Sequence, residues 1–253
     1  MATVNIDASF YPYVSRQPVA PEAWAAIKAG VGNWMGAGVV GGWRCATAPS
    51  ANLYSYLWRS IIVFDTSELS GRQIFSASLV LVLDGGIDDQ HDFPTFNIFT
   101  ATPANPAVIV ATDYGNCGAT PFSDEIQPTL PTLIEDPAGA ASGVYQFPLN
   151  ALGLNHINKT GYTSFSLRES TYDAGVGTPT WADDSRGVAW FHARIPLLAV
   201  SCSDAASADR TLQEPIVLLQ AMRQVEMQFG GQLSISKEGT FTYRSRQSYY
   251  EGV

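Results

Sequence analysis

The amino-acid sequence predicts an all-β fold, an antiparallel β-sandwich of the jelly-roll type. Many short segments rich in β-branched and apolar residues are separated by Gly, Pro, Asn and Asp, which is typical of strands joined by turns. Only two segments have the features of helices, so an α/β fold is not favoured. The chain of 253 residues is long enough for one large sandwich, predicted over residues 1–203, and a smaller C-terminal segment.

The strongest strand signal is RSIIVFDTSELSGRQIFSASLVLVLDG, residues 59–85, in which two apolar runs flank a polar turn. The second run alternates at first and then becomes continuously apolar, so we expect a central strand that is buried on both faces. Further strands are predicted at residues 4–6, 95–99, 143–147, 164–169, 188–192 and 197–201. The predicted core includes Ile61, Val63, Leu79, Leu81, Leu197 and Val200.

The two predicted helices lie near the two ends of the chain. Residues 21–30, PEAWAAIKAG, begin with Pro and end with Gly, as short helices do. After a polar linker at residues 204–214, the segment 215–253 begins with a helix and continues with QLSISKEGTFTYRSR, whose alternation predicts a hairpin. The helix has one apolar face, formed by Leu218, Met222, Val225 and Phe229. Because a helix and a hairpin are too small to close a core, we expect this face to dock on a partner.

The composition and charge exclude several classes of partner. The chain is 46% hydrophobic and 15% charged, against about a quarter charged in typical domains, which indicates a folded protein. Its formal net charge is −9 and its basic residues form no cluster, so binding to nucleic acid or to an anionic membrane is not expected. The sequence contains no run of about 18 apolar residues, so membrane insertion is not predicted, and the N-terminus lacks the features of a secretory signal. We therefore expect synthesis in a host cytoplasm and release by lysis or on a particle.

Four carboxylates gather in the loop DGGIDDQHD: Asp84, Asp88, Asp89 and Asp92. Oxygen ligands at this density predict a structural calcium site if the loop folds back on itself. The alternative is a solvated loop whose carboxylates cap turns, because the spacing is not that of an EF-hand loop. The solvated loop is the favoured interpretation, so the sequence predicts no cofactor and leaves calcium as the alternative.

An aromatic-rich region extends from Trp24 to Trp58. Exposed aromatic rings stack on sugar rings, but aromatic side chains also fill the cores of sandwiches, and both roles are open here. The candidates for contact with a ligand are Trp34, Trp43, Tyr54 and Tyr56.

No catalytic constellation is predicted. The segment GAGVVGG, residues 36–42, contains G-x-G-x-x-G but follows a helix rather than a strand, which argues for a loop and against a dinucleotide site. The three histidines are far apart in sequence and no nucleophile motif accompanies them. The three cysteines are also widely spaced and predict neither a disulfide framework nor a zinc site. Arg59 and Arg168 are expected at strand ends, where they would form salt bridges to carboxylates.

The order of these motifs resembles the DNRLRE-type β-sandwich domains of surface-attached bacterial proteins and of structural proteins of tailed bacteriophages. The resemblance spans about residues 3 to 203 and is carried by FDTSEL after Arg59, IFSASLVLVL, LNALGLNHINKTGYTSFSLR and the closing PLLAVSCS. Separately, LLQAMRQVEMQFGGQLSISKEGTFTYRSR resembles a helix–hairpin of phage minor-tail and baseplate-type proteins.

Together the two resemblances imply a non-enzymatic structural protein of a tailed-phage virion, a tail, fibre or decoration component that displays a sandwich for attachment. Its partners would be other virion subunits, including copies of itself, and a glycan of the host surface. The alternatives are a carbohydrate-binding module of an extracellular bacterial protein and a hydrolase built on a sandwich scaffold.

Overall fold

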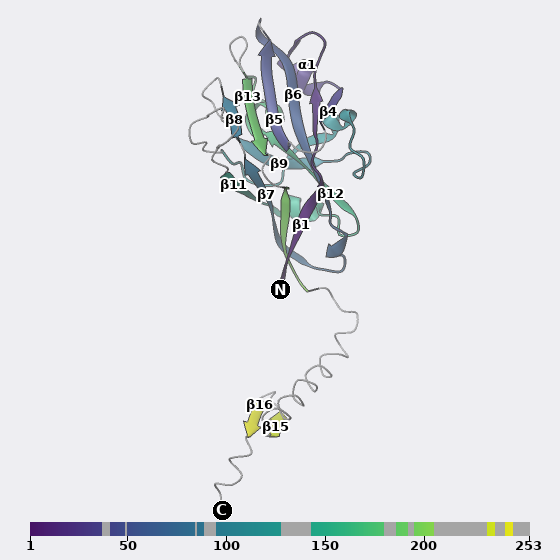
Figure 1. Ribbon diagram of the computed structural model, residues 1–253, viewed down its shortest axis with the longest axis vertical. Helices are drawn as coiled ribbons and strands as arrows, with labels where there is room; N and C mark the ends of the chain where they lie inside the picture. The colour runs from purple at the N-terminus through teal and green to yellow at the C-terminus, as the bar shows by residue number, and fades with distance from the viewer. Residues whose placement is uncertain are drawn as a thin grey trace, which may run out of the picture. The chain divides into compact units, whose positions relative to one another are not determined.

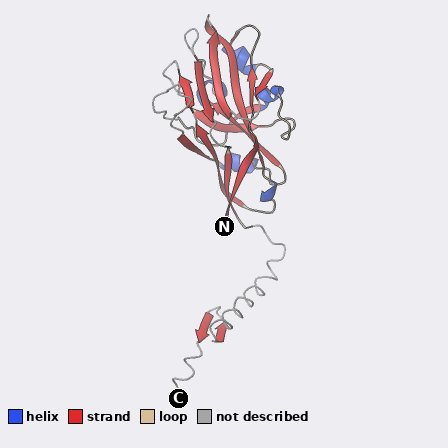
Figure 2. Cartoon of the chain, in the orientation of Figure 1, coloured by secondary structure: helices blue, strands red, loops and turns tan. Residues whose placement is uncertain are grey.

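A computed structural model of the chain describes residues 1–36, 41–48, 50–83, 85–88, 95–127, 143–179, 186–191, 195–204, 232–235 and 241–244. The chain divides into two compact units, Met1–Ala205 and Ala206–Val253. The first unit is mostly antiparallel β-sheet with a few short helical turns (Figures 1 and 2), which confirms the predicted all-β class. In the second unit, β15 (Gln232–Ile235) and β16 (Phe241–Arg244) pair antiparallel.

Two sets of antiparallel strands share the first strand, β1. Residues 2–7 of β1 belong to one set and its last residues to the other. The first set has the order β11 (Gly143–Pro148), β7 (Ile74–Leu83), β14 (Leu197–Cys202) and β1 (Ala2–Phe10). The second set has the order β10 (Cys117–Pro121), β9 (Phe96–Ala101), β12 (Tyr162–Glu169), β6 (Ser50–Asp65) and β1.

Strand β6 is long because its first half supports an additional group of strands. Three of them pair directly with β6: β2 (Tyr13–Arg16), β3 (Glu22–Ala23) and β5 (Gly41–Ala48). Three more extend the group, with β4 (Trp34–Gly36) on β2, β13 (Arg186–Phe191) on β5 and β8 (Gly85–Asp88) on β13. The sequence did not predict β2, β4, β5 or β8. The interpretation of GAGVVGG as a loop is wrong at its ends, because Gly36 is the last residue of β4 and Gly41 and Gly42 begin β5.

Short helical elements connect and cover the strands. These are α1 (Trp24–Ala29), the 3-10 turns η1 (Ser67–Leu69) and η2 (Ala111–Asn116), α2 (Ala151–His156) and the π-helical turn η3 (Ser170–Ala174). The predicted helix at residues 21–30 starts only at Trp24, because the two residues before it pair with β6 as β3. Among the described residues, no helix is long and apolar enough to span a membrane.

One hydrophobic cluster contains residues from both strand sets, including Leu79 and Val200 from the first and Phe165 from the second. Five of the six predicted core residues are buried: Ile61, Val63, Leu79, Leu81 and Val200. The prediction is wrong for Leu197, because β14 alternates so that Leu198 faces the core and Leu197 is only half-buried.

Strand β7 lies between β14 and β11, as expected for a central strand, but it is not buried on both faces. Ala77, Leu79 and Leu81 are buried, whereas Ser78 and Val80 on the other face remain partly exposed and only Val82 of that face's described residues in the apolar run is buried. The continuous apolar run therefore marks a covered second face at Val82 and not along its whole length.

The polar turn after β6 is held by the buried hydroxyl group of Thr66. Its Oγ1 atom lies 2.5 Å from the carbonyl oxygen of Asn158, 2.8 Å from that of Gly161 and 2.7 Å from Oγ1 of Thr163. At the turn's surface, the Asp65 carboxylate accepts a hydrogen bond from the backbone N–H of Ser67. The FDTS sequence thus joins the end of β6 to the loop before β12.

We expect Thr66→Val to lower the free energy of unfolding by about 1–3 kcal/mol, because it removes the hydroxyl from a buried hydrogen-bond cluster without changing the side-chain shape. Urea denaturation measures the effect. Thr3→Val, at an exposed position of β1, is the matched control and should shift the free energy of unfolding by less than about 0.5 kcal/mol. Equal effects of the two substitutions would contradict this role of Thr66.

Candidate functional site

The first half of β6 separates two environments. Leu57 and Arg59 point to a buried face, whereas Tyr56 and Trp58 are only half-buried on the other. The exposed side of the strand therefore carries aromatic rings, and the buried side carries a charge. Both environments are built from residues that lie far apart in the sequence.

The half-buried rings form a group that we call the aromatic stack: Tyr13 of β2, Trp34 of β4, and Tyr56 and Trp58 of β6. The rings of Tyr13 and Trp58 are stacked, with centroids 4.1 Å apart and planes inclined by 15°. Trp34 lies 5.1 Å from Tyr13 and 6.0 Å from Trp58, at 39° and 26°. Tyr56 lies 6.0 Å from Trp58 at 43°. Neighbouring rings are thus nearer to parallel than to perpendicular. The side chain of Trp34 is 41% exposed.

A glycine makes room for the centre of the stack. Tyr13 is the cross-strand partner of Gly36, and a Cβ atom at Gly36 would lie 2.0 Å from the Tyr13 ring. The ring therefore lies on the bare backbone of β4, a known way for an aromatic side chain to cover a glycine in a sheet. Ser15, the next residue of β2 on the same face, pairs with both Trp34 and Trp58 and is small enough to leave space for their rings.

The structure places the predicted ligand-contacting residues in different environments. Trp34 and Tyr56 belong to the aromatic stack, and the side chain of Trp43 lies outside the described residues. The prediction is wrong for Tyr54, which is fully buried, packs against Trp24 and donates a hydrogen bond to the carbonyl oxygen of Pro179. Its side chain is not available to an external ligand.

A bulge explains why Tyr54 leaves the exposed face. Ala46 of β5 pairs with Tyr56, but the next residue, Thr47, pairs with Tyr54, so Ser55 is an extra residue in β6. An extra residue reverses the side-chain alternation of a strand. Tyr54 therefore faces inward although its sequence spacing matches that of Tyr56 and Trp58. Sequence reasoning also missed Tyr13, whose place in the stack depends on the pairing of β2 with β6.

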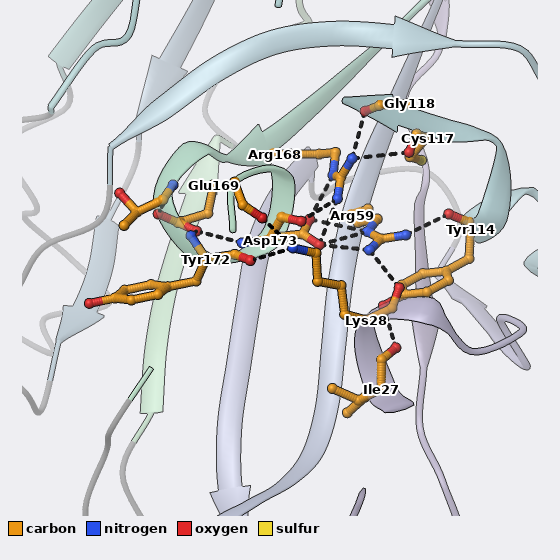
Figure 3. A network of polar contacts seen from close by, with 12 residues as sticks. Ile27, Lys28, Arg59, Tyr114, Cys117, Gly118, Arg168, Glu169, Tyr172 and Asp173 are labelled. Atoms are coloured by element: carbon orange, nitrogen blue, oxygen red, sulfur yellow. Dashed lines mark hydrogen bonds and ion pairs between the residues drawn. The ribbon is translucent and has the colours of Figure 1, made fainter. Parts of the chain in front are cut away.

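On the buried face, Asp173 binds two arginines (Figure 3). Arg59 Nη2 lies 2.7 Å from Asp173 Oδ1, and Arg168 Nε lies 2.8 Å from Asp173 Oδ2. All three side chains are buried, and Asp173 is fully inaccessible. The salt bridges predicted for Arg59 and Arg168 are thus confirmed, and both arginines share one carboxylate. The predicted position at a strand end holds for Arg168, next to last in β12, but is wrong for Arg59, which lies in the interior of β6.

The two arginines also reach backbone carbonyl groups of three other segments. Arg59 donates to the carbonyl oxygens of Tyr114 and Lys28, each at 2.9 Å, and its guanidinium lies 3.9 Å from the centroid of the Tyr114 ring. Arg168 donates to the carbonyl oxygens of Cys117 and Gly118. The network therefore ties α1, η2 and β10 to the central strands β6 and β12.

Glu169 and Lys28 complete the network at the π-helical turn η3. The Glu169 carboxylate accepts hydrogen bonds from the backbone N–H groups of Thr171, Tyr172 and Asp173. Lys28 Nζ donates to the carbonyl oxygens of Tyr172 and Gly175. Helix α1 is therefore fastened to the middle and to the C-terminal end of the turn that carries Asp173.

The ionisation of these groups follows from burial and from their partners. Burial alone would raise the pKa of Asp173, but the charges of Arg59 and Arg168 outweigh it and hold this pKa well below the usual range. Burial raises the pKa of Glu169 and lowers that of Lys28. Because Asp173 is enclosed and kept ionised by two arginines, the network suits a structural role and not proton transfer with a substrate.

A separate hollow of about 500 Å³ lies beside β4 and the connection from β1 to β2. Its lining is mostly apolar: Ser9, Phe10, Tyr11, Pro12, Met35, Ala107, Val108 and Ile109. None of its described lining residues carries a charge, so these residues form a nonpolar depression. Met35 faces this hollow, while its neighbour Trp34 faces the aromatic stack.

The remaining predicted sites fall on residues that the structure does not describe. Asp84, Asp89 and Asp92 of the acidic loop lie outside the described residues, and only the backbone of Asp88 is described, in β8. Within the described part of the chain, no group of three or more His, Cys, Asp or Glu side chains is arranged to hold a metal ion. The predicted docking residues Leu218, Met222, Val225 and Phe229 also lie outside it.

No family model matches the chain, and no curated protein matches it either. The geometry of the aromatic stack and of the buried network therefore carries the functional conclusion.

We expect Asp173→Asn to lower the free energy of unfolding by about 3–5 kcal/mol at neutral pH, because two buried guanidinium groups lose their counter-charge. Asp65→Asn, at an exposed carboxylate, is the control and should change it far less than Asp173→Asn does. The pKa of Asp173 is lowered in the folded state, so its ion pairs contribute fully to the free energy of unfolding above the usual Asp pKa of about 4. This contribution is lost progressively as the pH falls from that value toward the lowered pKa of the folded state. Urea denaturation from about pH 7 down to about pH 2, which covers the upper part of this titration, should show the difference between wild type and variant shrinking at the acid end. A constant difference would contradict the ion pairs.

Gly36→Ala should displace the Tyr13 ring and disrupt the aromatic stack, because the new methyl group would overlap the ring. We expect a loss of the near-ultraviolet circular dichroism signal of the stacked rings and a fall in the free energy of unfolding of about 1–3 kcal/mol. The matched control is Gly115→Ala, where a Cβ atom would meet nothing within 4 Å. An unchanged spectrum in Gly36→Ala would show that the ring does not depend on the glycine.

Proposed function

We propose that this chain is a non-enzymatic structural protein of a tailed-phage virion that displays a jelly-roll β-sandwich for attachment to a host surface. The aromatic stack is the surface that makes the contact. In this proposal the segment after residue 203, with its helix–hairpin, joins the sandwich to neighbouring virion subunits or to further copies of the chain.

The observation that carries the proposal is the partial exposure of an ordered group of aromatic rings on a strand platform. Trp34 is 41% exposed although it touches both Tyr13 and Trp58. Large aromatic side chains with one apolar face open to solvent are typical of binding surfaces. Strands β2, β4 and β6 hold these rings, and a site on paired strands is held more precisely than one on a loop.

The buried network of Asp173, Glu169, Arg59 and Arg168 also supports the proposed attachment function. Asp173, Glu169, Arg59 and Arg168 are inaccessible and bind one another or backbone groups. Their ion pairs and hydrogen bonds therefore fix which segments of the scaffold meet behind the stack. The same stack also favours the second candidate, a carbohydrate-binding module of an extracellular bacterial protein, which shares the attachment chemistry but not the virion.

Binding of the full-length protein to a panel of bacterial cell-envelope preparations tests the attachment role. We expect at least one preparation to bind the wild type and Trp34→Ala to weaken that binding about tenfold or more, because the exposed ring is removed. Phe75→Ala is the matched control, since Phe75 is 43% exposed and lies on β7, outside the stack. If Phe75→Ala and Trp34→Ala weaken binding to the envelope preparation equally, the aromatic stack is not the contact surface. Mass spectrometry of purified phage particles separates the virion protein from the bacterial module.

A further inference from the structure

A polar side chain, that of Gln17, is bonded to the cross-strand partner of the most exposed ring of the aromatic stack. The Gln17 side chain donates a hydrogen bond from Nε2 to Oγ of Ser15, at 3.0 Å. Ser15 is the cross-strand partner of Trp34, and directly paired residues have their Cβ atoms about 5 Å apart on one face of the sheet. The Gln17 carboxamide is therefore held on the face of the sheet that carries Trp34.

The backbone around this carboxamide is fixed by a second amide. Asn33 Oδ1 accepts a hydrogen bond from the Gln17 N–H at 2.8 Å, and Asn33 Nδ2 donates to the Gln17 carbonyl oxygen at 2.7 Å. On the opposite side, Arg16 is paired with Glu22 and donates to the carbonyl oxygen of Val31. The segment that presents Trp34 and Gln17 is thus fastened before any ligand arrives.

The Gln17 side chain has hydrogen-bonding capacity to spare. A carboxamide has two N–H donors and one carbonyl acceptor. One N–H bonds to Ser15, and within the described residues no hydrogen bond to Oε1 or from the second N–H is recorded. Gln17 is only partly buried, so these groups face a site that solvent or a ligand can reach. An acceptor and a donor on one planar group match the adjacent hydroxyl groups of a sugar.

We propose that Trp34 and Gln17 form a binding site for an uncharged pyranose ring, which stacks on Trp34 and donates and accepts hydrogen bonds at the Gln17 carboxamide. This inference rests on the proposed attachment function and names the chemical class of its ligand. Asn33 acts as a positioning residue, because its bonds go to the backbone of Gln17.

The ring geometry favours a flat ligand over a cation. A cage for a quaternary ammonium group needs rings that surround it, whereas the rings here are inclined to their neighbours by 15° to 43° and cover one another. Among the four described rings of the stack, Trp34 is the most exposed, at 41%. Such a surface suits the apolar face of a sugar ring.

Charge decides between an uncharged sugar and other flat ligands. The formal net charge of the chain is −9, which opposes acidic sugars and nucleic acids. Proteins that stack nucleobases combine aromatic rings with a basic groove. Here Arg16 is already paired with Glu22, and Lys28 binds backbone carbonyl groups. The chemistry at Trp34 therefore fits a neutral glycan.

The test uses the full-length protein and the envelope preparation that it binds. Mild periodate oxidation, which cleaves the vicinal diols of sugars, should abolish binding, and digestion of envelope proteins should leave it intact. Binding should also be insensitive to salt, since a neutral ligand has no charge to screen. Gln17→Ala should weaken binding about threefold to tenfold through the lost hydrogen bonds. Trp34→Tyr should restore most of the affinity that Trp34→Ala loses.

Asn5→Ala, at an exposed amide of β1, is the control for Gln17→Ala and should bind as the wild type does. Unchanged melting temperatures of Gln17→Ala and Trp34→Ala would show that both variants are folded. Binding that survives periodate, is removed by protease or falls steeply with salt would overturn the neutral-sugar assignment while attachment itself stands. If no envelope preparation binds the wild type, the attachment function fails and the sugar site with it.

Discussion

The shared ion pair of Asp173 with Arg59 and Arg168 is the interaction on which the rest of the fold depends. The two arginines come from adjacent central strands, and their remaining donors reach the backbone of α1, η2 and β10. A buried ion pair adds little net stability compared with well-packed apolar residues, but removing one partner is costly because the other charge stays buried. The network therefore serves above all to specify which segments meet, because the backbone carbonyl groups of α1, η2 and β10 each accept a hydrogen bond from one of the two arginines.

Strand β6 couples this network to the candidate binding surface. Arg59 and Trp58 are consecutive residues, so the strand that anchors the charge also presents the aromatic ring on its other side. Helix α1 and the turn η3 fix β6 from behind through Arg59, and β2 and β4 add Tyr13 and Trp34 in front. The stack is thus held by backbone pairing and by a buried network rather than by mobile loops. This is the pre-organisation that a surface needs if it is to bind a ligand without first becoming ordered.

Two small residues decide how the rings meet. Gly36 lets the Tyr13 ring lie on β4, and Ser15 leaves room between Trp34 and Trp58. The result is a set of overlapping rings, of which Trp34 is the most exposed. Had the rings stood perpendicular to one another, a cation would be the natural ligand, whereas overlapping rings offer a flat apolar surface. The Gln17 carboxamide beside it supplies the polar contact that gives such a surface selectivity.

The sequence by itself determined the all-β class, most of the central strands and five of six predicted core residues, because these depend on local alternation. It also determined that Arg59 and Arg168 form ion pairs, because burying a charge without a partner is costly. Only the tertiary structure decided which carboxylate the arginines share, since Asp173 comes from a π-helical turn with no recognisable sequence signal. It also decided which aromatic residues reach the surface. The bulge at Ser55 turns Tyr54 inward, and the pairing of β2 with β6 brings Tyr13 onto Trp58. Both depend on the register between neighbouring strands, which the alternation within one strand does not specify.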